Sequence, residues 1–354
     1  MFEYFKTLAS DYNLSLENVL SIALNRYGVL IDGYDDDRVR FNLKFNNSIK
    51  EDFFALCVNT YKDSPFKLVD NTIYLKDEKI AEITNLERDT CTSTYFRNNK
   101  RDITFNSNSR SKCAGCTFCG TYSLSEDDDY DFSNKESIKK YFDKLLKENK
   151  VKSLEYINSI TLCTGCFESE DDLYNHILLL NSTFKDMGFK GSINYIGSQL
   201  RDYEKIKSLK DEVGNFGLYL TIEKFIDREK FMRPEKASLK LNDAKDLLNY
   251  SSSIGINSTF LYILGLEDLD AIKYYFNYFK DSINKFPIVQ IFQDYVPIQE
   301  NYRHESAKEV EYYLKAKKII NDTFSDTSLR PKLWENFRSL YYENPEKEFV
   351  KCKK

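Results

Sequence analysis

Short apolar runs alternate with longer amphipathic segments between residues 102 and 293. The runs have the length and the β-branched and aromatic content of strands that are covered on both faces. The segments between them repeat apolar residues at helical spacing, as in Leu173, Ile177 and Leu180. This alternation predicts a parallel sheet with right-handed helical crossovers. The expected strands are 102–105, 159–162, 192–197, 217–223, 258–265 and 288–293.

Polar residues mark where two of the helices should begin. Ser133 and Glu136 have the spacing of a capping box, ahead of a helical stripe of apolar residues. Ser169 through Asp172 is expected to cap the next long helix. Further helices are expected near 242–253 and 268–282, and one long helix around 305–322.

Residues 1–100 are expected to form a separate small unit. A helix is predicted over 14–24 and a strand over 38–43. The segments 67–75 and 80–83 are expected to pair as a hairpin. This mixture of helix and strand predicts a small α+β domain, and no residue in it carries recognisable chemistry.

Composition narrows the class of protein. The 354 residues suffice for one large domain, or for one domain with a small second one. A net charge of −5 without a basic cluster argues against nucleic acid as the main partner. No apolar run approaches a membrane span, and the N-terminus lacks a signal peptide's order of charged and apolar residues. The expected location is therefore cytoplasmic, where eight cysteines favour metal binding or catalysis over disulfides.

The densest group of metal ligands is the run Cys113, Cys116 and Cys119, in a loop that also holds Gly115. Thiolates at this density hold zinc or an iron–sulfur cluster. Bacterial ferredoxins begin with the same spacing, but the position of their fourth Cys is occupied here by Ser123. A four-iron cluster on this run would keep one iron free of Cys. Such an iron suits a cluster that must bind a small molecule directly.

This run resembles the cluster motif of the radical S-adenosylmethionine (radical SAM) superfamily. That family holds a [4Fe–4S] cluster with three closely spaced cysteines and lets S-adenosylmethionine (SAM) chelate the fourth iron. Its usual spacing is C-x3-C-x-aromatic-C. Cys116 to Cys119 matches the second half, with Phe118 in the aromatic place. The first half of the motif departs from the family's spacing, because two residues instead of three separate Cys113 from Cys116.

The order of strands and helices also resembles the six-unit barrel of this family. The resemblance covers about residues 102–300 and implies an α/β fold, a partial (β/α)6 TIM-like barrel over 101–300. A small α+β N-terminal domain (1–100) would precede it, and a helical C-terminal extension (301–354) would follow. In β/α barrels the chemistry lies at the carboxyl ends of the strands, which is where the cysteine loop falls.

The resemblance implies which residues contact SAM. After its second strand the family usually has a Gly-Gly-Glu-Pro segment that binds the amino group. Gly165 and Glu168 match this segment, without the proline. On the fifth strand, Ile263 and Gly265 match the family's adenine-flanking motif, in which Leu261 replaces the first Gly.

The fourth strand of the family ends in a polar residue that meets the ribose and the SAM carboxylate. The two-residue period of a strand predicts that Thr221 and Glu223 share one face there. Arg233 follows, and its planar fork suits the methionine carboxylate. Gln293 and Tyr295, at the end of the sixth strand, are expected to be further residues that could face the site.

The function that the resemblance implies is that of a radical SAM enzyme. A reduced cluster would cleave SAM to methionine and a 5′-deoxyadenosyl radical, which would abstract hydrogen from a small-molecule or peptide substrate in a biosynthetic pathway. The electron would come from a donor such as flavodoxin or ferredoxin. Neither nucleic acid nor a membrane is expected as a partner. The residues leave the substrate and the outcome of the reaction open.

The remaining cysteines are expected to have different roles. Cys166 is the candidate catalytic residue, because it follows the second strand on the rim and its weak S–H bond could donate hydrogen to a substrate radical. Cys163 closes an apolar strand and is expected to pack, as is Cys57. Cys91 and Cys352 are scattered over other segments. A second cluster built on Cys163 and Cys166 is therefore not expected.

A zinc-stabilised binding protein is one alternative. Cys113 and Cys116 could pair with Cys163 and Cys166 as two C-x2-C knuckles. A closed site of four thiolates is structural rather than catalytic. This alternative leaves Cys119 without a role.

A barrel enzyme of non-radical chemistry, with incidental cysteines, is the other alternative. The chain has two histidines, His176 and His304, and His176 lies on an expected helix beside Ile177. Acid–base catalysis and many metal sites depend on histidine more than on any other residue. The sequence therefore does not favour this class.

Overall fold

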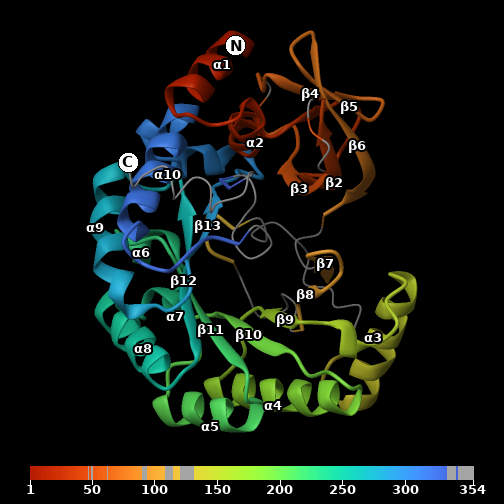
Figure 1. Ribbon diagram of the computed structural model, residues 1–354, viewed down its shortest axis with the longest axis vertical. Coiled ribbons are helices and arrows are strands. Elements are labelled where there is room, and N and C mark those ends of the chain that lie inside the picture. Colours follow the sequence, from red (N-terminus) through yellow and green to blue (C-terminus); the bar gives the residue numbers. More distant parts are fainter. Residues whose placement is uncertain are drawn as a thin grey trace.

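The larger of two β-sheets curls around an interior, and helices line its outer face (Figure 1). The computed structural model describes residues 1–46, 48, 51–61, 63–89, 94–107, 115–119, 131–332 and 340–341. The smaller sheet lies in the N-terminal part of the chain and is mostly antiparallel. Within these residues the protein is a mixed α/β protein with a curled parallel sheet, that is, a partial barrel.

The larger sheet contains the predicted parallel strands. Its members are β7 (Tyr95–Arg97), β8 (Asp102–Phe105), β9 (Ser159–Cys163), β10 (Ser192–Gly197), β11 (Phe216–Glu223), β12 (Asn257–Leu264) and β13 (Ile288–Ile291). The order is β13-β12-β11-β10-β9-β8-β7, and β8 to β13 pair in parallel. The six predicted strands are thus confirmed. β7 adds an antiparallel strand beside β8 that the sequence did not predict, because its three residues form no apolar run.

The helices around the larger sheet lie between and after its strands along the chain. They are α3 (Lys135–Glu148), α4 (Glu170–Asp186), α5 (Tyr203–Val213), α6 (Arg228–Phe231), α7 (Pro234–Ala237), α8 (Leu241–Ser253), α9 (Leu269–Phe279) and α10 (Val310–Phe324). Short 3-10 turns lie at Leu154–Tyr156, Lys280–Ser282, Pro297–Tyr302 and Glu305–Lys308. The last predicted helix therefore begins later than expected, at Val310. Within the described ranges, no helix combines the length and apolar character needed to cross a bilayer.

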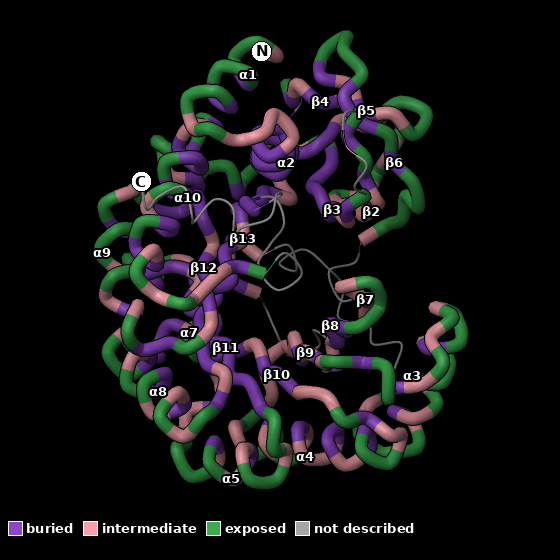
Figure 2. Tube along the Cα trace, in the orientation of Figure 1, coloured by how far each residue is buried: buried purple, intermediate pink, exposed green. Residues whose placement is uncertain are grey.

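The two faces of the larger sheet differ in polarity. On β8, Phe105 packs edge-on against Phe142 of α3, with ring centroids 5.0 Å apart. Thr104 and Asp102 alternate with it and face the interior of the partial barrel. Along most of the sheet the strands are buried, whereas the outer sides of the helices are exposed (Figure 2). The helix-facing side is thus an apolar core, and the interior side carries polar groups.

One of the two predicted helix caps is confirmed and the other is wrong. Ser169 and Asp172 form a reciprocal capping box at the start of α4, as predicted. The predicted box of Ser133 and Glu136 is wrong, because α3 begins one residue later than that box requires. Its N-cap is Asn134, whose side chain accepts from the Ser137 amide at 2.9 Å.

The part of the molecule here called the N-terminal half, residues 1–89, contains two helices and the smaller sheet. Its elements are α1 (Phe2–Asp11), α2 (Leu16–Tyr27), β1 (Leu30–Ile31), β2 (Arg38–Phe45), β3 (Asp52–Cys57), β4 (Phe66–Val69), β5 (Thr72–Leu75) and β6 (Glu78–Arg88). The predicted hairpin of 67–75 with 80–83 is confirmed in part, because β5 pairs antiparallel with β6. The segment 67–75 is not a single strand. Asp70 and Asn71 take positive φ angles of 46° and 66°, which folds it into the β4–β5 hairpin.

Polar side chains after β13 join the two halves. The Gln293 side-chain oxygen accepts from the Cys57 amide at 2.9 Å, and its NH2 group donates to Asn25 Oδ1 at 2.8 Å. Tyr295 Oη accepts from Arg38 at 2.9 Å. The expectation that Gln293 and Tyr295 face the site is therefore wrong. Both side chains form hydrogen bonds with residues of the N-terminal half.

Candidate functional site

The described part of the cysteine loop, residues 115–119, lies at the carboxyl ends of the parallel strands. Cys116 and Phe118 are 4% and 3% exposed. They belong to an apolar cluster, here called the loop cluster, whose other members come from the segments that follow β11, β12 and β13: Met232, Ala237, Leu266 and Phe292. The predicted position of the loop is thus confirmed for these residues. Cys113 lies outside the described residues.

Hydrogen bonds from two directions fasten this loop. The Thr117 amide donates to the Phe231 carbonyl at 2.9 Å, and its hydroxyl donates to the same oxygen at 3.1 Å. On the other side, Gln299 Nε2 donates to the Thr117 carbonyl at 2.9 Å and to the Cys119 carbonyl at 3.2 Å. The Cys119 amide in turn donates to the Cys116 carbonyl at 2.8 Å. The backbone that carries both thiols is therefore held by segments following β11 and β13.

An ion pair lies beside the loop. Lys236 Nζ is 3.1 Å from both carboxylate oxygens of Glu223. Burial acts to lower the pKa of Lys236, but Glu223, Cys116 and Cys119 together raise that pKa above its usual value. Lys236 therefore stays cationic between a carboxylate and the two described thiols of the motif. Sequence reasoning missed it, because a lysine in a short helix matches no motif.

The Cys116 thiol is shielded from water. Burial raises the pKa of Cys116 to about 12, although Lys236 and a hydrogen bond from the Arg233 backbone act in the opposite direction. The thiol is therefore neutral at pH 7 unless a metal binds it, since coordination deprotonates a thiol outright. The neighbouring ammonium and amide groups are suited to offset the charge of a coordinated thiolate.

The end of β11 departs from the predicted strand geometry. The register shifts between Thr221 and Glu223, and Glu223 has a φ of 61°. The expected alternation that would place both side chains on one face is interrupted by this bulge. The bulge turns Glu223 toward Lys236. Thr221 is buried, and its hydroxyl finds no hydrogen-bond partner among the described residues.

The other predicted SAM contacts lie around the same rim. Gly165 is half-buried in the segment after β9, which Gln199 fixes through two 2.8 Å hydrogen bonds with the Phe167 backbone. Glu168 is exposed. Arg233 precedes α7 and pairs with Glu235 at 3.5 Å. Ile263 on β12 packs against the loop cluster and also against Tyr219, Leu261 and Ile288 lower in the partial barrel.

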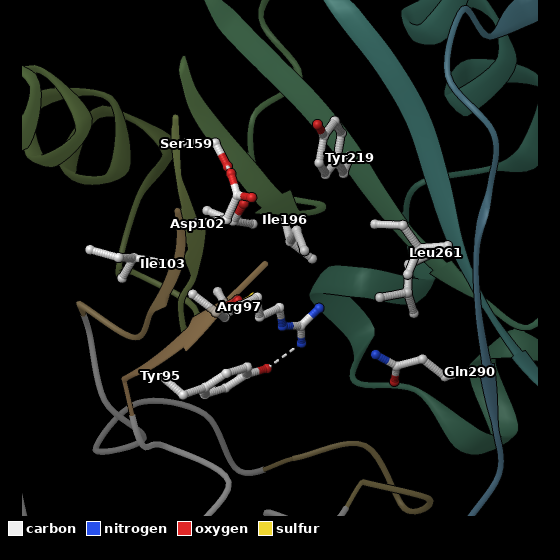
Figure 3. Close-up of a pocket in the computed structure, with 13 residues that line it drawn as sticks. Tyr95, Arg97, Asp102, Ile103, Ser159, Ile196, Tyr219, Leu261 and Gln290 are labelled. Atoms are coloured by element: carbon white, nitrogen blue, oxygen red, sulfur yellow. Dashed lines mark hydrogen bonds between the residues drawn. The ribbon is translucent and has the colours of Figure 1, made fainter. Parts of the chain in front are cut away.

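A cavity of about 80 Å³ lies inside the curled sheet (Figure 3). One wall comes from β7, β8 and β9 and is largely polar, and the opposite wall comes from β10 to β13. Ile263 packs both against the loop cluster and against the lining residues Tyr219, Leu261 and Ile288. The lining residues are Tyr95, Arg97, Asp102, Ile103, Thr104, Ser159, Thr161, Cys163, Ile196, Tyr219, Leu261, Ile288 and Gln290.

Cys163 and Cys166 occupy different places. Cys163, expected only to pack, lines the cavity, because it shares the inward face of β9 with Ser159 and Thr161. Cys166 is half-buried in the segment that follows and acts electrostatically on Tyr195 and Arg201. Cys57 is fully buried, as predicted, and Cys91 and Cys352 lie outside the described residues.

The zinc alternative needs Cys116, Cys163 and Cys166 in one place. In the part of the chain that the structure describes, no three His, Cys, Asp or Glu residues are grouped as a metal site. The electrostatic neighbours of these cysteines also differ, since Cys116 faces Lys236 and Cys163 faces Arg97. His176, which a His-based site would use, has its Nε2 atom 2.9 Å from Ser107 Oγ.

No protein family profile matches the chain, and no curated protein matches its sequence. Solved structures that are similar to it include two radical SAM proteins. Coproporphyrinogen III oxidase (HemN) from Escherichia coli, a radical SAM enzyme, aligns with 14% identity and a TM-score of 0.39 over 60% of this chain and 49% of that one. The radical SAM methyltransferase TsrM from Kitasatospora setae, solved with cobalamin and a [4Fe–4S] cluster, aligns with 12% identity and a TM-score of 0.37 over 56% of this chain and 38% of that one.

Both of these solved structures are of radical SAM enzymes. The chain spans about half the length of HemN and less of TsrM.

Proposed function

We propose that the chain is a radical SAM enzyme whose [4Fe–4S] cluster is held by Cys113, Cys116 and Cys119. When bound, the reduced cluster supplies the electron that cleaves SAM, so that a 5′-deoxyadenosyl radical can remove hydrogen from a small-molecule or peptide substrate. A protein such as flavodoxin or ferredoxin would supply that electron. The observation that carries the proposal is the place of the cysteine loop, buried at the carboxyl ends of parallel strands above a polar-lined cavity.

The described residues fit such a cluster. The motif offers three soft sulfur ligands and no fourth cysteine at the ferredoxin position. Cys116 lies in an apolar shell, which excludes water from a bound cluster. Lys236 and the Arg233 backbone stand beside its sulfur and compensate the charge of a thiolate.

The chain's own residues would bind and orient SAM at the rim. Glu223, fixed by Lys236, is suited to accept hydrogen bonds from ribose hydroxyls, and Arg233 is suited to a carboxylate. Thr221 offers a buried hydroxyl without a partner among the described residues. The other proposed cofactor contacts are Gly165, Glu168, Ile263 and Phe118, and Cys166 is retained as a proposed hydrogen donor.

The test combines iron content with SAM cleavage. Anaerobically reconstituted protein should bind about four irons per chain and, with dithionite, form 5′-deoxyadenosine from SAM. Cys119→Ala should abolish both, because three thiolates leave no ligand to spare. Cys119 is the better choice for this variant, since it is less buried than Cys116.

Two further variants make the result specific. Cys57→Ala removes a buried thiol that lies outside the motif, on β3, and should leave iron content and SAM cleavage unchanged. Cys166→Ser should retain the iron, because Cys166 is not a cluster ligand in this proposal. Full iron content and SAM cleavage in Cys119→Ala would overturn the cluster assignment.

A further inference from the structure

The backbone folds back on itself at the end of β11, where Glu223 lies. The Lys224 amide donates to the Ile222 carbonyl at 2.7 Å, and Glu223 between them has a φ of 61°. A hydrogen bond that spans one residue with a positive φ is a γ-turn of the rare and strained type. A residue with a Cβ keeps such a conformation only where the surrounding structure enforces it.

A buried carboxylate holds the residues that follow this turn. Glu267 lies shortly after β12, the neighbour of β11 in the larger sheet (Figure 1), and is 3% exposed. Its Oε1 atom accepts from the Phe225 amide at 3.0 Å and from the Ile226 amide at 2.5 Å. The amides of residues 224, 225 and 226 are therefore all bonded, the first within the turn and the other two to Glu267.

Glu267 is itself fixed from several sides. The Tyr262 hydroxyl donates to its Oε2 atom at 3.0 Å, and the Tyr312 hydroxyl of α10 donates to its backbone carbonyl at 2.5 Å. Lys224 Nζ donates to the Leu266 carbonyl at 2.9 Å and lies 3.6 Å from Glu267 Oε1. The carboxylate is thus a fixed support for the segment after the turn.

The turn sets the direction of the Glu223 side chain. It coincides with the register shift between β11 and β12, so the regular alternation of the strand ends there. Beyond the shift, both carboxylate oxygens of Glu223 lie 3.1 Å from Lys236 Nζ at the rim. Glu267 is buried, so it acts on a ligand at the rim through this backbone and not by direct contact.

We propose that Glu267 is a positioning residue: it holds Glu223 in the γ-turn and thereby keeps the Glu223 carboxylate where it accepts from the ribose hydroxyls of SAM. The ribose contact rests on the proposed radical SAM function. The hold of Glu267 on the turn does not, because it depends only on hydrogen bonds within the chain.

Two small changes separate the position of the accepting oxygen from its charge. Glu267→Gln keeps an oxygen at the same reach without the charge, and Glu267→Asp keeps the charge but draws the oxygens back by one CH2 group. If the oxygen position matters, SAM affinity should stay within about threefold in Glu267→Gln and fall about fivefold or more in Glu267→Asp. Equal affinities in the two variants would overturn the proposal.

Calorimetry on the anaerobically reconstituted protein without reductant gives these affinities, since SAM is then not cleaved. The unaltered protein should bind SAM at least about tenfold more tightly than 2′-deoxy-SAM, which lacks one ribose hydroxyl. Glu267→Asp should lose this preference and keep its iron. A preserved preference in Glu267→Asp would show that Glu267 does not position the ribose contact.

Asp268→Ala is the matched control. Asp268 is the neighbouring acid, but it is exposed and accepts from the Ala271 amide at 2.7 Å as the N-cap of α9. This variant should lose stability and keep the preference for SAM over 2′-deoxy-SAM. The same loss of preference as in Glu267→Asp would assign the effect to general destabilisation and contradict a specific role of Glu267.

A double-mutant cycle tests whether Glu267 acts through Glu223. In a Glu223→Ala background the carboxylate that Glu267 positions is absent, so adding Glu267→Asp should change SAM affinity by less than about twofold. The same fall in affinity in both backgrounds would contradict the proposed route.

Hydrogen exchange without SAM reports on the turn itself. The amides of residues 225 and 226 should exchange faster in Glu267→Asp than in the unaltered protein or in Glu267→Gln, because they lose their acceptor. Unchanged exchange of these amides in Glu267→Asp would contradict the hold of Glu267 on the turn. By contrast, a failure of the unaltered protein to bind SAM would contradict the proposed function, so the two failures are distinguishable.

Discussion

Single polar residues that match no motif shape much of the site. Lys236 pairs with Glu223 beside the two described motif thiols, and Gln299 fastens the cysteine loop from the segment after β13. The sequence predicted the cysteines and Glu223 because motifs have fixed spacing along the chain. It could not predict Lys236 or Gln299, because these residues lie about 120 and 180 positions after the cysteine loop that they contact.

Part of the polar interior of the barrel could be predicted from the sequence. Ser159, Thr161 and Cys163 alternate along one strand, so the two-residue period alone places all three on one face. The prediction that Cys163 packs treated the strand as uniformly apolar and did not foresee that its side chain also lines the cavity. Arg97 could not be assigned, because nothing local shows that a three-residue strand joins the sheet edge.

His176 carries a testable pH dependence. Burial lowers the pKa of His176 to about 4, whereas an unfolded histidine titrates near 6.5. As the pH falls from 6.5 toward 4, the unfolded state binds a proton that the folded state does not, so the free energy of unfolding falls. The stability that neutral His176 provides is thus present above pH 6.5 and is lost on acidification, by up to about 3 kcal/mol.

The measurement compares the unaltered protein with His176→Gln in urea at pH 7, 5.5 and 4. Titration of other groups cancels in the difference between the two proteins. The unaltered protein should lose its advantage over the variant, or fall below it, as the pH drops. A difference in the free energy of unfolding that stays constant over this range would contradict the assignment.

Among whole elements, long strands and helices were predicted well and short features were not. The six parallel strands are apolar on the helix-facing side, and this signal is strong over four or more residues. The β4–β5 hairpin was missed because its turn consists of Asp70 and Asn71, which were read as part of one strand. The bulge at the end of β11 was missed because it depends on pairing with β12.

The start of α3 gives a clean test of sequence pattern against structure. Ser133 and Glu136 match a capping box, yet the described cap is Asn134, which accepts from the Ser137 amide. Asn134→Ala should lower the free energy of unfolding by about 1 kcal/mol. Ser133→Ala should change it by less than about 0.5 kcal/mol. Urea unfolding followed by circular dichroism checks both, and a larger loss for Ser133→Ala would restore the sequence-based cap.

Across the whole molecule, the N-terminal half is fixed to the partial barrel rather than loosely tethered. α2 packs against α10 and β13, and the Arg303–Asp294 ion pair is fully buried behind the junction. Arg303 also donates to Tyr313 of α10 and to Tyr61 of the N-terminal half. The sequence predicted two units here but no contact between them, because these hydrogen bonds join residues more than 200 positions apart.

Gln293 is the residue on which this junction can be tested. It is 4% exposed and serves three groups of the N-terminal half: the Cys57 amide, Asn25 Oδ1 and the Ala55 carbonyl. Gln293→Leu keeps the size of the side chain but leaves these groups without that partner. The free energy of unfolding should fall by about 2 to 4 kcal/mol, because a buried polar group that loses its partner bears its full desolvation cost.

Hydrogen exchange shows where that loss is felt. In Gln293→Leu the amides of residues 52–58, which include the Cys57 N–H, should exchange faster, since β3 loses its anchor to the end of β13. Gln290→Leu is the matched control, because Gln290 lies three residues earlier, on β13, and lines the cavity instead. It should leave exchange in β3 unchanged. If both variants loosened β3 equally, the effect would come from general destabilisation and Gln293 would not be the link between the two halves.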